Sequence, residues 1–258
     1  MVDRLTKLID TAERQRAADP RFLDDLRDAL NAYAQSQVPL FIKDNFSDGD
    51  IAKNPAWTIA SGKFRLEKNG GLRSIVRASG NTQSGKQDAA SAILDTILGS
   101  GKKGGGGGGG GTLVSAQRAE VFTPAKITNA FSVLGTVLVR SPASDFEWVV
   151  YQGADRSSGY RLNYTTDDTS TAVFELSRFN RKGSSVIDSG EPPVSMEDGG
   201  AHKIEWKRGA GGAMTVAIDG EAFLSITDQG IKTGFDGLVM ANNDGDVLFR
   251  DIEVRGVR

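Results

Sequence analysis

The stretches FEWVVY at residues 146–151 and YRLNY at residues 160–164 decide the fold class of this chain. Large apolar side chains recur at every second position, and polar or charged side chains fall between several of them. Successive side chains of a β-strand point to opposite faces, so a period of two predicts strands with one buried face. The predicted core face consists of Phe146, Trp148, Val150, Tyr160, Leu162 and Tyr164.

Similar short stretches fill the chain from about residue 41 to residue 258. Gly, Asp and Asn residues separate them, and helical patterns are almost absent, which is typical of an antiparallel sandwich or barrel. IDGE at residues 218–221 is the clearest hairpin, because Asp-Gly supplies both left-handed positions of a tight turn. Strands are predicted at 57–60, 63–67, 73–78, 131–140, 146–151, 160–164, 171–178, 202–207, 214–218, 221–226, 237–241 and 247–254.

Residues 1–38 have helical periodicity instead, with apolar side chains three and four positions apart. Asp19 followed by Pro20 is a helix-start signal, so we expect two short helices with a break near Ala18. Helices of this length are marginal alone, so their apolar stripes must bury against something. The segment either docks on the sandwich or holds the chain in a homo-oligomer, and the sequence leaves both open.

Residues 84–111 interrupt the strand pattern. Asp88 can cap a short helix that ends at Leu98, and an unbroken run of eight glycines occupies residues 104–111. We expect a flexible surface loop, with a packed glycine structure or a recognition loop as the alternative. GNTQSGKQ at residues 80–87 resembles a phosphate-binding loop, but Gln87 replaces the required Ser or Thr, so nucleotide binding is not predicted.

Composition excludes several classes of function. The formal net charge of −2 gives no general attraction to nucleic acid or to anionic lipid. The absence of cysteine excludes disulfides and thiolate chemistry. Charges interrupt the N-terminus too often for a secretory signal, and no stretch approaches the ~18 apolar residues of a membrane helix. We expect cytoplasmic synthesis, with release on an assembled particle as one route out of the cell.

Seven short motifs occur in an order that is informative. They are DNFSDG (44–49), SGKF (61–64), SGYRL (158–162), AHKIEW (201–206), VAIDG (216–220), GFDGL (234–238) and VLFRDIEV (247–254). In this order they resemble the concanavalin A-like lectin/glucanase superfamily, with laminin-G-like domains and sandwich hydrolases of keto-disaccharides as the nearest members. The resemblance implies a two-sheet jelly roll over residues 44–258, with paired first and last strands and a concave sheet where sugars often bind.

The candidate ligand-binding residues lie on the strand face opposite the predicted core. Sugars are bound by aromatic faces and by planar polar groups that meet their hydroxyls. Alternation places one such set on the face expected to be concave: Tyr151, Arg161, Asn163, Glu147, Glu175 and Ser177. We therefore predict a polysaccharide or glycan as the partner.

Catalytic motifs are absent from the sequence. Sandwich glucanases carry a Glu-x-Asp-x-(x-)Glu run on one strand, and this chain has no such run. In the keto-disaccharide hydrolases an acidic residue tends to follow the Gly-Tyr that matches Gly159-Tyr160, and Arg161 occupies that position. The only histidine, His202, matches the start of a strand in the superfamily pattern, which favours a structural role.

A structural calcium ion is the one cofactor that the sequence suggests. Hard oxygen donors cluster near both ends of the predicted sandwich, including Asn45, Asp50, Asn243, Asp244 and Asp246. If the end strands pair, some of these donors meet, and the candidate ligands are Asp44, Asp48 and Asp251.

The sequence thus favours a non-enzymatic carbohydrate-binding or attachment module. The helical segment, the glycine-rich loop and the absence of a leader would fit a spike or fibre component of a phage-like particle. Two alternatives stay open: a glycoside-processing hydrolase of the sandwich type, and a purely structural surface or particle protein.

Overall fold

The computed structural model describes residues 2–36, 38–77, 118–166 and 171–257. The predicted helix and glycine run at 84–111 and the phosphate-loop-like motif at 80–87 lie outside these residues. The chain divides into two compact units, Met1–Leu40 and Phe41–Arg258.

The first unit is a pair of helices, as the sequence predicts. Helix α1 spans Val2–Arg14 and helix α2 spans Pro20–Ser36. Asp19 caps α2, because its Oδ1 accepts hydrogen bonds from the backbone N–H groups of Arg21 (2.9 Å) and Phe22 (3.4 Å). Neither described helix is long and apolar enough to cross a membrane.

The second unit consists of antiparallel strands, as the alternation predicts. In the described residues they are β1 (Leu40–Asp44), β2 (Thr58–Ser61), β3 (Arg65–Leu66), β4 (Leu72–Val76), β5 (Ala119–Ile127), β6 (Phe131–Val139), β7 (Ser144–Gln152), β8 (Ser158–Thr166), β9 (Val173–Asn180), β10 (Gly183–Gly190), β11 (Ala201–Arg208), β12 (Ala213–Ile218), β13 (Glu221–Thr227) and β14 (Phe235–Gly256).

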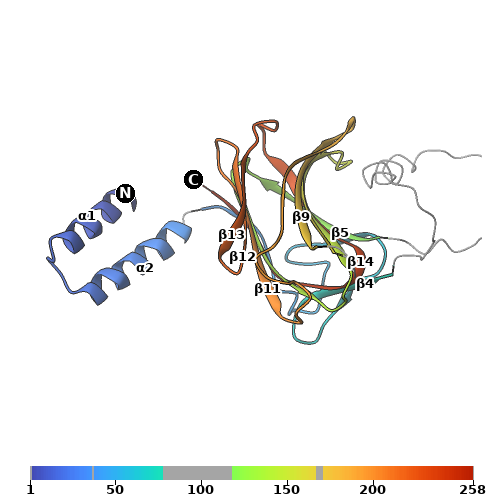
Figure 1. Cartoon of the computed structure of the whole chain (residues 1–258), viewed down its shortest axis with the longest axis horizontal. Helices are drawn as coiled ribbons and strands as arrows, with labels where there is room; N and C mark the ends of the chain where they lie inside the picture. Colours follow the sequence, from blue (N-terminus) through green and yellow to red (C-terminus); the bar gives the residue numbers. More distant parts are fainter. Residues whose placement is uncertain (1, 37, 78–117, 167–170, 258) are drawn as a thin grey trace, which may run out of the picture. The chain divides into compact units, whose positions relative to one another are not determined.

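The strands form two layers that share β14 (Figure 1). Sheet A has the order β13–β12–β11–β6–β14–β4–β3. Sheet B has the order β10–β9–β8–β7–β14–β5–β2. The first strand, β1, pairs with the last, β14. The antiparallel jelly-roll sandwich with a short N-terminal helical segment is therefore confirmed.

The core between the sheets contains all six side chains predicted for it. Aromatic rings from both sheets meet edge to face or tilted, as Phe131 and Trp206 do with ring centroids 5.3 Å apart. Position 135 on β6 needs glycine, because a Cβ there would lie 2.6 Å from Ile252 Cδ1 and 2.9 Å from the Trp148 ring. All three tryptophans are buried.

The prediction of two separate strands at 237–241 and 247–254 is wrong, because both belong to β14. The intervening Asn-Asn-Asp-Gly has turn chemistry, yet the backbone passes through it from sheet B into sheet A. Residues up to Asp244 pair with β7, and residues 245–249 pair with β4.

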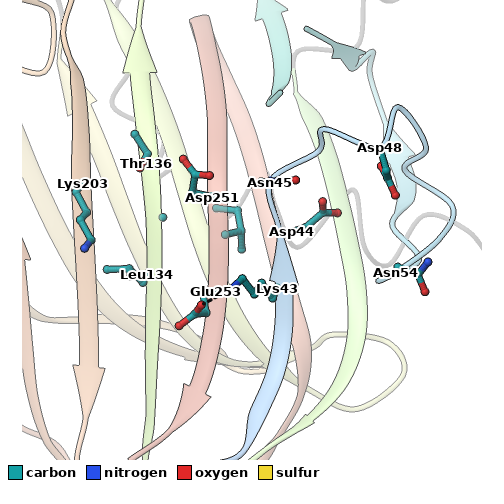
Figure 2. Close-up of a pocket in the computed structure, with 12 residues that line it drawn as sticks. Lys43, Asp44, Asn45, Asp48, Asn54, Leu134, Thr136, Lys203, Asp251 and Glu253 are labelled. Atoms are coloured by element: carbon teal, nitrogen blue, oxygen red, sulfur yellow. Dashed lines mark ion pairs between the residues drawn. The ribbon is translucent and has the colours of Figure 1, made fainter. Parts of the chain in front are cut away.

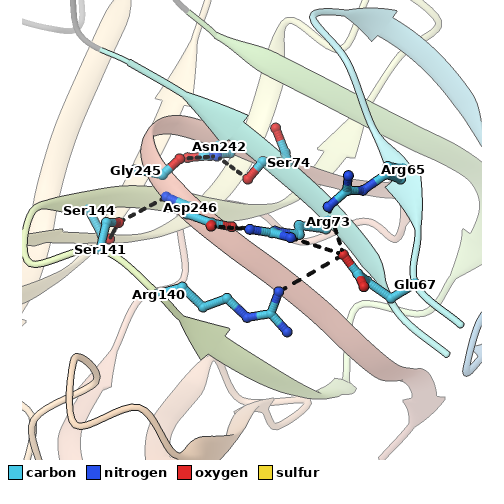
Figure 3. Close-up of polar contacts among 10 residues, drawn as sticks. All are labelled: Arg65, Glu67, Arg73, Ser74, Arg140, Ser141, Ser144, Asn242, Gly245 and Asp246. Atoms are coloured by element: carbon cyan, nitrogen blue, oxygen red, sulfur yellow. Dashed lines mark hydrogen bonds and ion pairs between the residues drawn. The ribbon is translucent and has the colours of Figure 1, made fainter. Parts of the chain in front are cut away.

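Side chains from distant strands hold this crossing in place (Figure 3). Asn242 Nδ2 donates to the carbonyl oxygens of Ser74 (3.0 Å) and Gly245 (3.1 Å). The backbone N–H of Asp246 donates to Ser141 Oγ at 2.8 Å, and its carboxylate accepts from Arg73 Nε at 2.6 Å. The polar residues at the crossing therefore form long-range hydrogen bonds instead of a turn.

Strands β1, β5 and β10 were not predicted from the sequence. Strand β5 contains Pro124, which lacks an N–H and argues against a strand interior. Strand β10 lies at the end of its layer and is mostly polar, so it lacks the apolar alternation that marks a half-buried strand.

The first prediction concerns Gly245, whose φ is +91°. A Cβ at Gly245 would lie 2.6 Å from the carbonyl oxygen of Ala143, whereas Gly220, at φ +90°, has open space around it. We expect Gly220→Ala to lower the free energy of unfolding by about 1 kcal/mol through backbone strain alone. Gly245→Ala should lower the free energy of unfolding by roughly 1–3 kcal/mol more than Gly220→Ala does, because the new Cβ clashes with its neighbours. Urea unfolding of both variants measures the difference. Equal losses of unfolding free energy in the two variants would contradict the close packing described at the crossing.

A second prediction concerns His202, the buried imidazole at the start of β11. Its Nδ1 lies 2.7 Å from Asp219 Oδ2 and its Nε2 lies 3.0 Å from Asp198 Oδ1. Burial lowers the pKa of His202, but the two carboxylates outweigh burial and raise it above 6.5.

The protonated imidazole therefore stabilises the fold fully below pH 6.5, and the stabilisation is lost as pH rises through the raised pKa. The difference in unfolding free energy between the natural chain and His202→Gln should shrink from about pH 6 to about pH 9. A difference that is constant across this range would show that the imidazole is not charged in the fold.

Candidate functional site

The predicted ligand-binding residues lie on one face of sheet B, opposite the core. In the strand register Glu147 pairs with Asn163, and Asn163 pairs with Glu175. In the next row Arg161 pairs with Ser177. These side chains come from β7, β8 and β9 and form two adjacent rows across the strands. We call this surface, together with its neighbours on β5 and β14, the sheet B face.

Glu147 is the centre of a buried ion network on this face, with 1% of its surface exposed. Its carboxylate contacts the guanidinium groups of Arg118 and Arg161, the second at 3.1 Å from Arg161 Nε to Oε2. Burial raises the pKa of Glu147, but the two guanidinium groups outweigh burial and hold it below its usual range. Glu147 is thus a fixed anion rather than a proton donor at neutral pH.

The network extends to Arg118, Asn243 and Asp145, which were not predicted to lie on this face. Arg118 Nη1 donates to Asn243 Oδ1 at 2.7 Å, and Asn243 Nδ2 donates to Asp145 Oδ1 at 2.8 Å. Burial raises the pKa of Asp145 to about 6, and the charge of Glu147 adds to the rise. Asp145 could have been found, because it precedes Glu147 by two positions on β7. No pattern in the sequence around Arg118 indicates that it belongs to this site.

An apolar cluster occupies the other half of the sheet B face. It consists of Val149, Tyr151 and Val239, with Phe122 and Phe179 packed against them. Tyr151 is almost fully buried, and its ring meets Phe122 edge to face at 6.4 Å. A ligand on this face would therefore meet the partly exposed Phe122 and Phe179 before Tyr151.

The polar half of the sheet B face offers accessible groups. Glu175 is exposed and has no ion pair among the described residues. Asn163 is partly exposed, and its Nδ2 donates to Thr165 Oγ1 at 2.7 Å, which leaves its Oδ1 as an acceptor. Arg161 lies over the Phe179 ring at 5.1 Å from the centroid. Ser177 is buried.

A cavity of about 520 Å³ lies on the outer face of sheet A, away from the sheet B face (Figure 2). We call it the sheet A cavity. Strands β1, β6, β11 and β14 form it together with residues between β1 and β2. Its lining is Lys43, Asp44, Asn45, Asp48, Asn54, Leu134, Gly135, Thr136, Lys203, Asp251, Ile252 and Glu253.

The three predicted calcium ligands, Asp44, Asp48 and Asp251, all line this cavity. Asp44, however, accepts hydrogen bonds on both oxygens, from the Phe46 N–H at 2.7 Å and from Trp57 Nε1 at 2.8 Å. In the described part of the chain, no three acidic or histidine side chains are arranged to hold a metal ion. Asp44 therefore anchors Trp57, and the calcium site stays a prediction without support from the described residues.

Comparison of structures, and not of sequences, detects similarity between this chain and known proteins. No protein-family model matches the chain, and no curated protein matches its sequence. The β-glucanase of Bacillus licheniformis is 8% identical, with a TM-score of 0.55 over 86% of this chain and 100% of that chain. The carbohydrate recognition domain of Emp46p is 12% identical, with a TM-score of 0.53 over 84% of this chain and 97% of that chain.

A third similar structure is the binding domain of botulinum neurotoxin DC in complex with SialylT, which is 11% identical with a TM-score of 0.50. That match covers 85% of this chain and 47% of the toxin chain. Identities this low show a shared fold alone. With the sheet order and the paired end strands, they identify the sandwich of this chain as a concanavalin A-like lectin/glucanase fold.

Proposed function

We propose that the sandwich is a non-enzymatic carbohydrate-recognition module that binds its glycan on the sheet B face. The observation that carries the proposal is the pairing of free polar groups with aromatic side chains on that face. Glu175 and the Oδ1 of Asn163 are available to sugar hydroxyls. Phe122 and Phe179 lie on the same face, in its apolar half, and both are partly exposed. Arg156 lies over the Phe122 ring at 4.1 Å and Arg161 over the Phe179 ring at 5.1 Å, so a sugar ring can meet the parts of these rings that the guanidinium groups leave open.

The buried ion network supports this role by holding the polar half of the face rigid. Arg161 is fixed between Glu147 and the Phe179 ring, so it loses little conformational freedom when a ligand binds. Glu147 and Tyr151, which the sequence placed among the ligand contacts, are buried and would position their neighbours instead.

A hydrolase of the sandwich type is the second candidate. Asp145 and Glu147 alternate along β7, and their surroundings move their pKa values in opposite directions, which is the pattern of an acid and its partner. Against this candidate, Glu147 is almost inaccessible and already neutralised by two arginines. We therefore place recognition ahead of turnover.

The third prediction tests the sheet B face. A glycan array should identify a bound glycan. Asn163→Ala, which removes a hydrogen bond to a hydroxyl, or Glu175→Gln, which removes the charge that strengthens one, should then weaken its binding roughly tenfold. Glu205→Gln is the matched control, because it removes a carboxylate from the outer face of sheet A. A blank array together with turnover of a keto-disaccharide would reverse the order of the two candidates.

Residues 1–38 are proposed to hold the chain in a homo-oligomer. Among the described side chains of the helical unit, Ile9 and Leu23 are the only buried apolar ones. Leu8 and Phe22 are 57% and 54% exposed, and Leu5 and Leu26 are exposed as well. Two helices of 13 and 17 residues with so small a core need further burial. A second copy of the same unit offers a matching apolar surface.

Such an oligomer would display several sandwiches together and multiply weak glycan contacts. Attachment to a glycan surface, as a spike or fibre component of a phage-like particle, is the context that we propose for this arrangement. A purely structural particle protein would share the oligomer but bind no glycan.

The fourth prediction tests the oligomer. Leu8→Lys combined with Phe22→Lys should reduce the mass measured by light scattering to that of one chain, because the charges oppose burial of the helical face. Arg21→Ala, beside Phe22 on α2, should leave the mass unchanged. A natural chain that is already monomeric would favour docking of the helices on their own sandwich.

A further inference from the structure

The sheet A cavity contains polar groups with no partner among the described residues. The carboxylate of Asp251 and the ammonium of Lys203 form no ion pair there, and the hydroxyl of Thr136 forms no hydrogen bond. They come from three adjacent strands, β14, β11 and β6 (Figure 2). The cavity therefore offers a free acceptor, a free donor and a hydroxyl between them.

A bulge in β14 exposes the Asp251 side chain. The register of β14 against β6 shifts between Arg250 and Glu253, and Asp251 has a φ of +50°. A non-glycine residue in this conformation is strained. Bulges of this kind change the direction of a side chain relative to the regular strand. Asp251 is exposed, whereas its neighbour Ile252 packs into the core.

The spacing of the groups limits what can fit between them. Lys203 is the register partner of Thr136 on one side of β6, and Arg250, next to Asp251, is its partner on the other. Two strand spacings separate β11 from β14, which is about 10 Å. Leu134 provides a partly exposed apolar surface in the same cavity. This gap accommodates a single ring that contacts both strands.

The charges of the lining favour an uncharged ligand. The lining carries the ammonium groups of Lys43 and Lys203 and four carboxylates, those of Asp44, Asp48, Asp251 and Glu253. The carboxylates repel an anion, and the Lys203 ammonium repels a cation placed between Asp251 and Lys203. A neutral ring with several hydroxyls can donate to the carboxylates and accept from the ammonium at once. The amide of Asn54, which has no partner among the described residues, adds both a donor and an acceptor at the loop side.

We infer that the sheet A cavity is a second carbohydrate subsite, which holds one uncharged sugar unit between Asp251 and Lys203. Its ligand class rests on the proposed function, but its residues do not overlap with the sheet B face. Lys43 and Glu253, 3.8 Å apart, close one side of the cavity as an ion pair.

The test uses the full chain and defined sugars. Glucose, galactose, mannose and N-acetylglucosamine are titrated while the methyl resonances of Leu134 and Ile252 are followed by NMR. At least one of these sugars should shift both methyl groups. Glucuronate and glucosamine, which carry opposite charges, should bind more weakly than the neutral sugar.

Variants then assign the shifts to the cavity. Asp251→Asn removes the charge while keeping a residue that tolerates the left-handed backbone, and Lys203→Ala removes the ammonium. Each should weaken binding roughly tenfold. Lys207→Ala is the matched control, because Lys207 lies on the same strand and the same face as Lys203 but outside the cavity.

The inference is overturned if none of the four sugars shifts the methyl groups. Shifts that survive both Asp251→Asn and Lys203→Ala would also overturn it, as would equal binding of the charged sugars. Asn163→Ala on the sheet B face should leave these titrations unchanged. Binding in the cavity with a sheet B face that binds nothing would therefore refute the proposed function and not the subsite.

Discussion

The passage of β14 from sheet B into sheet A is the constraint on which the rest of the structure depends. The strand is central in both layers, with β7 and β5 beside its first half and β6 and β4 beside its second. A polar strand interior would normally weaken a sheet, but Asn242 and Asp246 exchange hydrogen bonds with Ser74 and Arg73 from β4. The relative position of the two sheets, and so the shape of the core, follows from this one crossing.

Both candidate sites depend on the same strand. Val239 of its first half lies on the sheet B face, and Asp251 of its second half lines the sheet A cavity. The two surfaces are on opposite outer sides of the sandwich, because side chains of each sheet that do not face the core face outward. Two separate binding surfaces on one rigid scaffold would allow a polysaccharide to be held at more than one point.

The buried charges of the sheet B face have a different physical role from the core. Arg118 directly precedes β5, Glu147 lies on β7 and Arg161 on β8, so their contacts join segments on both sides of β14. Burying such a network costs desolvation energy that an apolar cluster would not. Arg161 Nε lies 3.1 Å from the carboxylate of Glu147 but has no acceptor in hydrogen-bonding geometry. We attribute the buried ion network to its role in holding the side chains of the sheet B face in place.

The sequence by itself determined the sandwich core, the Asp19 cap and the Asp219-Gly220 hairpin. Each of these depends only on strand alternation or on residues that are neighbours in the chain. The common face of Glu147, Arg161, Asn163 and Glu175 followed from alternation in the same way. Only the tertiary structure decided that Asp44 holds Trp57, that Arg118 pairs with Glu147, and that β14 is continuous. Each of these depends on partners that the chain brings together from distant strands, and period-two patterns carry no information about which strands become neighbours.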